Sequence, residues 1–150
     1  MILFTRVAKR YPQGIEALNG VTFHLEKGAF LFVSGPSGAG KTTLVKMVLG
    51  IERPTEGSVI VAGRNVSALR PAAVPFLRRN IGTVFQDFKL LETRTVYQNI
   101  ALGLEILGWN RRDIRTRVGQ LLERLGLERL ANHRPQEISG GEQQRVAIAR

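Results

Sequence analysis

One segment of the chain has the residue types and spacing that bind a polyphosphate. Residues 35–42 read Gly-Pro-Ser-Gly-Ala-Gly-Lys-Thr, which fits the pattern G-x-x-x-x-G-K-[ST]. Triphosphate oxygens need many donors at close range, and glycine lets backbone N–H groups approach because it has no Cβ. A helix beginning near Gly40 would add free N–H groups and a positive end. The pattern therefore predicts a phosphate loop, in which Lys41 bridges the β- and γ-phosphates and the Thr42 hydroxyl holds Mg²⁺.

The residues on both sides of this loop are those that the motif requires. Residues 29–34 form a short apolar run that predicts a strand covered on both faces, and residues 42–49 carry a helical apolar stripe. A dinucleotide site is excluded by spacing, because the glycines do not spell G-x-G-x-x-G. The predicted nucleotide-binding residues of this segment are Gly35, Ser37, Gly38, Ala39, Gly40, Lys41, Thr42 and Thr43.

A second segment, near the end of the chain, opens another helix. Ser139 is a good N-cap, and Glu142 follows three residues later, as a capping box requires. By itself this is an ordinary helix start. The pair Gly140-Gly141 makes it more specific, because it exposes N–H groups to an anion at a positive helix end.

Together, the two segments resemble the phosphate loop and the signature motif of ATP-binding cassette (ABC) ATPases. Gln86 follows the predicted strand 81–85, where this family places its Q-loop glutamine. Tyr11 follows the first predicted strand, where the family places an aromatic residue that stacks on adenine. Packing in a turn is the alternative for Tyr11, and a solvent-facing strand end is the alternative for Gln86. The resemblance covers essentially all 150 residues.

The expected fold is α/β, a P-loop NTPase of the ABC type. It has a mixed β core with a parallel sheet and a helical subdomain, and the C-terminal part of the family fold is expected to be absent. Residues 1–95 are expected to form the nucleotide-binding core with the Q-loop. Residues 96–150 are expected to form the helical subdomain with the signature motif, ending before the Walker B strand. The remaining predicted strands are residues 2–8, 21–25 and 58–62.

The clearest helical pattern lies in the second part. In residues 111–127, an apolar set repeats at helical spacing and arginines cover the opposite face. The apolar set is Ile114, Val118, Leu121, Leu122 and Leu125. The arginine surplus is interpreted as a solvated face, with attraction to anionic lipid headgroups as the weaker alternative.

The resemblance also implies a mechanism. Such ATPases work as dimers that enclose ATP and Mg²⁺ between the phosphate loop of one copy and the signature motif of the other. Ser139, Gly140 and Gly141 would then close on the γ-phosphate bound by the second copy. Lys41 and Gln86 would take part in catalysis, and Gln86 would join Thr42 at the metal. A groove near Gln86 would receive an integral membrane partner.

Two further segments, Asp87-Phe88-Lys89 and Thr95-Val96-Tyr97, resemble the cell-division members of the family. The resemblance implies an FtsX-like membrane partner and a peripheral location on the cytoplasmic face of the bacterial inner membrane. The alternative is the ATPase of a transporter for lipoprotein release, macrolide export or nutrients, which differs in partner and not in chemistry.

Composition limits the other classes of function. The chain has no cysteine, which excludes a disulfide framework and a cysteine nucleophile. Lys and Arg number 22 against 12 Asp and Glu, and the net charge of +10 suits anionic partners. A nucleic-acid-binding ATPase is therefore a third hypothesis. Because the basic residues are dispersed and no basic stripe carries interleaved aromatics, no specific nucleic acid is expected.

The last expectation concerns activity. The sequence ends at Arg150, inside the helix that the signature motif begins. In the family, the strand that bears an aspartate and the catalytic glutamate comes next, followed by a switch histidine. We therefore expect these 150 residues by themselves to bind ATP weakly and to hydrolyse it negligibly.

Overall fold

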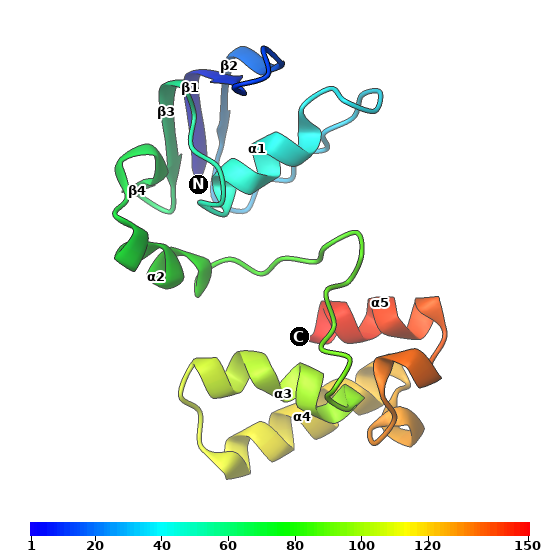
Figure 1. Cartoon of the computed structure of the whole chain (residues 1–150). Helices are drawn as coiled ribbons and strands as arrows, with labels where there is room; N and C mark the ends of the chain where they lie inside the picture. The colour runs from blue at the N-terminus through cyan, green and yellow to red at the C-terminus, as the bar shows by residue number, and fades with distance from the viewer. The chain divides into compact units, whose positions relative to one another are not determined.

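The structure of the chain is a computed structural model that describes residues 1–150. The chain divides into two compact units, Met1–Gly82 and Thr83–Arg150. The first unit contains all the strands, and the second contains the three longest helices of the chain (Figure 1). Each unit has its own hydrophobic core and is described by itself.

The first unit is built on a four-stranded antiparallel sheet with the order β2-β1-β3-β4. The strands are β1 (Ile2–Arg10), β2 (Glu16–Leu25), β3 (Glu56–Val61) and β4 (Arg64–Asn65). Tyr11 closes the β1–β2 turn, because its N–H donates to Ile15 O at 2.9 Å. The strands predicted at residues 2–8, 21–25 and 58–62 are confirmed.

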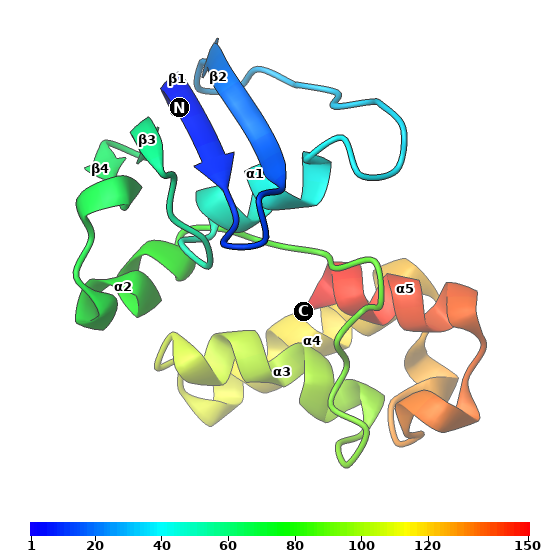
Figure 2. The same cartoon turned by 45° about the horizontal axis from the view of Figure 1, so that its top comes forward.

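Helix α1 (Lys41–Val48) packs on the sheet and completes the core of this unit (Figures 1 and 2). Its Met47 is fully buried with Phe4 of β1 and Val59 of β3. The short helix α2 (Val74–Arg78) adds Leu77 to the same cluster, after the 3-10 turns η1 (Val66–Ala68) and η2 (Pro71–Ala73). Burial of this apolar cluster fixes the direction of α1, and therefore the place where the phosphate loop ends.

The strands predicted at residues 29–34 and 81–85 are wrong. Neither segment is a strand, and the segment between β2 and α1 loops away from the sheet (Figure 2). Phe30 and Phe32 are 89% and 79% exposed. A parallel strand needs neighbours that pair with its N–H and C=O groups. The sheet of this chain is antiparallel throughout and offers neither segment a partner, so the predicted parallel pairing is not formed.

The second unit is helical. It contains α3 (Val96–Ile106), α4 (Arg111–Leu125) and α5 (Gly140–Ala149), with the 3-10 turns η3 (Glu128–Leu130) and η4 (Pro135–Glu137) before α5. The predicted stripe of α4 is confirmed, because Ile114, Val118 and Leu122 are buried and Leu121 and Leu125 pack against them. None of the helices has the length and apolar character that crossing a bilayer requires.

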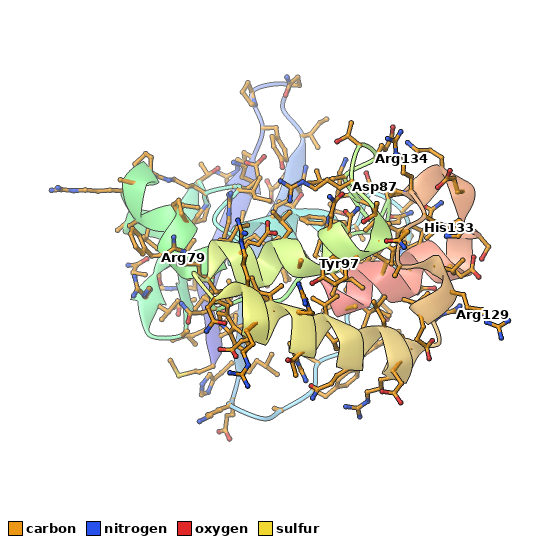
Figure 3. All side chains as sticks on the ribbon, turned by 90° about the horizontal axis from the view of Figure 1, so that it is seen from below. Arg79, Asp87, Tyr97, Arg129, His133 and Arg134 are labelled. Carbon is orange, nitrogen blue, oxygen red and sulfur yellow. The ribbon has the colours of Figure 1, made fainter.

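The arginines of α4 and Arg129 lie outside the core of this unit. Every arginine of α4 is exposed. Arg129, on η3, extends away from the ribbon at the edge of the unit (Figure 3). These positions agree with the interpretation of the basic surplus as a solvated face.

Candidate functional site

The phosphate loop ends in a helix whose first N–H groups have no side-chain cap. Gly40 is the N-cap of α1, with φ 85° and no side-chain hydrogen bond to the first turn. The first turn contains no acidic residue. An external anion can therefore reach these N–H groups and the positive end of the helix without displacing a carboxylate of the chain.

The glycines of the loop are needed for two different reasons. Gly38 and Gly40 both have left-handed backbones, with φ 82° and 85°. A Cβ on Gly40 would lie 2.2 Å from Ala17 O and 2.8 Å from Leu18 Cδ2, whereas a Cβ on Gly38 would meet nothing within 4 Å. Gly40 is thus required by packing against β2, and Gly38 only by its backbone conformation. Gly35, with φ 152°, and the exposed residues Ser37 and Ala39 complete the predicted loop.

The ammonium group of Lys41 lies over the loop. Its Nζ donates to Gly35 O and to Pro36 O, both at 2.7 Å. The lysine is therefore held at the start of the same loop whose end carries the uncapped helix. An ammonium that already has two loop carbonyls as partners can exchange them for phosphate oxygens without leaving the loop.

Tyr11 lies beside the first turn of α1. Its hydroxyl is 3.4 Å from Thr43 Oγ1, and either oxygen can donate. The Lys9 ammonium lies 5.0 Å from the centre of its ring. The structure therefore brings Tyr11 together with the loop, at the residue that follows Thr42. Thr42 itself is exposed, so its hydroxyl is accessible to a ligand.

The predicted capping box at the start of α5 is confirmed. Ser139 Oγ accepts from Glu142 N at 3.4 Å, and Glu142 Oε2 accepts from Ser139 N at 2.7 Å. Ser139 Oγ also donates to Glu142 Oε2 at 2.8 Å. These hydrogen bonds from Ser139, the side-chain one above all, lower the pKa of Glu142 below its ordinary value of 4.5.

Gly140 and Gly141 leave open space above the first turn of α5. A Cβ on either would meet nothing within 4 Å, and both residues are exposed. The glycines are therefore not required by packing within this chain. A partner that approaches the turn closely would supply a reason for them.

Gln86 is exposed and lies at the second position of a tight turn. The turn is closed by Phe88 N, which donates to Phe85 O at 3.0 Å. Asp87, the next residue, accepts from Lys89 Nζ at 2.6 Å, and this hydrogen bond lowers the pKa of the Asp87 carboxyl. Gln86 belongs to the second unit, with Ser139 and its neighbours on α5, whereas Tyr11 and the phosphate loop belong to the first.

One buried polar residue escaped the sequence analysis. Asn99 on α3 is fully buried, and its Oδ1 accepts from Leu91 N at 2.8 Å. Its Nδ2 donates to the carbonyls of Leu91, Arg94 and Thr95. Asn99 thereby ties the segment before α3 to the helix. The feature of the sequence that points to a buried amide is the position of Asn99 directly before the apolar residues Ile100 and Ala101.

Comparison with known proteins agrees with this geometry. A family model described as ABC transporter matches residues 18–150. The chain is 51% identical over 150 residues to the cell division ATP-binding protein FtsE of Escherichia coli (strain K12), and covers 68% of its length. It is 45% identical over 150 residues to FtsE of Bacillus subtilis (strain 168), and covers 66% of that protein.

A solved structure has the same fold. The match is to a dimeric post-hydrolysis state of the ATP-binding cassette MJ0796 bound to ADP and Pi, with 37% sequence identity and a TM-score of 0.90. It covers 99% of this chain and 68% of that chain. The expected fold class is therefore confirmed.

Proposed function

Because this chain belongs to the ABC transporter family of ATP-binding proteins, we propose that it is the ATP-binding subunit of a membrane-associated complex. The observation that carries the proposal is the phosphate loop. Its left-handed Gly38 and Gly40 lead into an uncapped helix, and Lys41 Nζ already lies 2.7 Å from two loop carbonyls. Donors gathered in this way are suited to a polyphosphate.

The site residues take the following roles in the proposal. The backbone N–H groups of Gly35 and of residues 37–43 bind the phosphates, Lys41 neutralises the β- and γ-phosphates, and Tyr11 stacks on adenine. The proximity of Tyr11 to Thr43 supports that role. The exposed hydroxyl of Thr42 is a hard oxygen donor of the kind that Mg²⁺ prefers, and Gln86 is the second proposed contact of the metal. Bound Mg²⁺ would neutralise phosphate charge.

The signature segment is proposed to act on a second copy of the chain. Ser139, Gly140 and Gly141 would contact the γ-phosphate that the second copy binds. The open space above both glycines supports the proposal, as does the dimeric state named for the MJ0796 cassette. These two roles support the proposed functional division between residues 1–95 and residues 96–150.

For the biological role, we favour cell division with an FtsX-like membrane partner, at the cytoplasmic face of the inner membrane. The 51% and 45% identities to proteins named FtsE support this choice. A transporter ATPase for lipoprotein, macrolide or nutrient remains the second candidate. Co-purification experiments would decide between them. Recovery of the protein with FtsX supports the cell-division role, and recovery with the membrane subunit of a lipoprotein-release transporter supports the second candidate.

We further propose that the 150 residues by themselves hydrolyse ATP negligibly. The segment with the exposed Phe30 and Phe32 leads into the phosphate loop and pairs with no strand. The sheet therefore does not support the start of the loop, which favours weak nucleotide binding. Phosphate release by the purified chain at a rate typical of ATPases, on the order of 1 per second or more, would contradict this proposal.

Equilibrium binding of Mg·ATP tests the core of the proposed function. Lys41→Ala should abolish or greatly weaken binding, because it removes the loop's ammonium. Lys46→Ala is the matched control, since Lys46 is exposed on the last turn of the same helix. Equal affinity of both variants for Mg·ATP would refute the assignment of the loop.

A further inference from the structure

The turn that presents Gln86 is followed by two residues in a costly backbone conformation. Phe88 and Lys89 have φ 55° and 51°, and neither is glycine. The left-handed conformation is unfavourable for any residue that has a Cβ, because the Cβ lies too close to the following carbonyl oxygen. Two in succession persist only when neighbouring groups hold them.

The group that holds them is the guanidinium of Arg150. Its Nη1 donates to Lys89 O at 2.7 Å, and its Nη2 donates to Phe88 O at 3.1 Å. The two arms of one planar fork thus bind the carbonyls of both left-handed residues. Burial lowers the pKa of Arg150 below its ordinary value, but a guanidinium remains charged at neutral pH, so these hydrogen bonds are charge-assisted.

Arg150 also has a fixed place relative to α5. It directly follows Ala149 of the helix, and its N–H donates to Val146 O at 3.0 Å. Gly103 of α3 packs closely on it, because a Cβ there would lie 2.8 Å from Arg150 O. The fork therefore projects from a point that two helices of the core determine.

Other contacts of the turn are weaker. The ion pair between Lys89 and Asp87 joins side chains that are 64% and 60% exposed, and exposed pairs contribute little. Asn99 fixes the following segment, from Leu91 to Thr95, but makes no hydrogen bond with Phe88 or Lys89. The N–H groups of Phe88 and Lys89 donate to Phe85 O and Asp87 O, but these hydrogen bonds lie within the turn itself. Arg150 is the residue outside the turn that binds the carbonyls of the left-handed pair.

We propose that Arg150 is a positioning residue for Gln86. Its fork keeps Phe88 and Lys89 left-handed and so sets the direction in which the turn presents the glutamine. Because α5 connects the signature segment to Arg150, a displacement of α5 along its axis moves the turn with it. The functional part of this inference rests on the proposed role of Gln86 at the nucleotide.

The test compares Arg150→Met and Arg150→Lys in the 150-residue chain. Methionine removes the fork, and lysine keeps the charge but has one ammonium in place of two arms. Hydrogen exchange of the Phe88 amide, which closes the turn, should become about tenfold faster or more in Arg150→Met and be intermediate in Arg150→Lys. Exchange of the Val118 amide in the core of α4 should stay unchanged. An unchanged Phe88 rate, or equal acceleration at Val118, would overturn the proposal.

A rescue variant separates positioning from general stability. Lys89→Gly tolerates the left-handed backbone without help. Added to Arg150→Met, it should restore most of the slow exchange of Phe88 and return the side-chain amide signals of Gln86 to their wild-type positions. A general packing role of Arg150 predicts no rescue, and absence of rescue would refute the proposal.

A nucleotide titration keeps the two proposals distinct. Mg·ATP should shift the Gln86 side-chain signals in wild type and not in Arg150→Met, while the loop amides respond in both. A response of Gln86 equal in both proteins would refute the positioning role. If the loop amides respond in neither protein, the proposed nucleotide function fails, and the exchange and rescue results still decide whether Arg150 holds the turn.

Discussion

Replacing Gly40 by alanine tests whether packing against β2, and not only the approach of a phosphate ligand, requires a glycine at this position. The new Cβ would lie 2.2 Å from Ala17 O, a backbone atom that moves only with β2. The left-handed backbone at φ 85° costs an alanine roughly 1–2 kcal/mol, and overpacking adds about 1–3 kcal/mol. Gly40→Ala should therefore lower the free energy of unfolding of the first unit by about 2–5 kcal/mol.

Gly38→Ala is the matched control, because Gly38 has nearly the same φ, 82°, and open space around it. It should lose only the backbone part, about 1–2 kcal/mol. Hydrogen exchange of the β1 amides over a urea series measures both variants. Fluorescence of Trp109, the single tryptophan and a residue of the second unit, should be unchanged. Equal losses in the two variants would refute the packing argument.

Three further predictions concern the helical unit. Asn99→Ala should lower its free energy of unfolding by about 3 kcal/mol, because Leu91 N and nearby carbonyls lose their partner; a loss below about 1 kcal/mol in urea unfolding would contradict this. The lowered pKa of Glu142 means that its carboxylate stabilises the fold above pH 4.5 and progressively less as pH falls below that value. The stability difference between wild type and Glu142→Gln should therefore shrink between about pH 4.5 and pH 2, and a constant difference would be inconsistent with the capping box. Gly141→Ala should leave folding unchanged or raise stability by up to about 1 kcal/mol, yet weaken ATP-dependent dimerisation in sedimentation; undiminished dimerisation would speak against the proposed contact.

Local signals in the sequence were sufficient for much of the structure. The capping box of Ser139 and Glu142 depends on residues three positions apart, and the stripe of α4 on a repeat of three to four positions. Strands β1 and β2 are neighbours in the chain and pair through one short turn. Each of these features is decided within a few residues or by adjacent elements.

The failures depend on distant partners. Residues 29–34 and 81–85 have the composition of buried strands, but composition does not reveal whether a neighbouring strand is present to pair with them. The hydrogen bonds of Arg150 to Phe88 and Lys89 span about sixty positions, and no pattern in the sequence predicts them. The need for Gly40 was predicted from phosphate approach, whereas the structure adds a second reason in Ala17 and Leu18.

The central claim is that the backbone N–H groups from Gly38 to Thr43, together with the Lys41 ammonium, bind the phosphates of a nucleotide. Titration of the folded chain with Mg·ATP, followed residue by residue through its amide NMR signals, tests it most directly. Saturable shifts at residues 38–43 that disappear in Lys41→Ala, with the Val118 signal unmoved, are the predicted result. Amide signals at residues 38–43 that stay in place at saturating nucleotide would contradict the account.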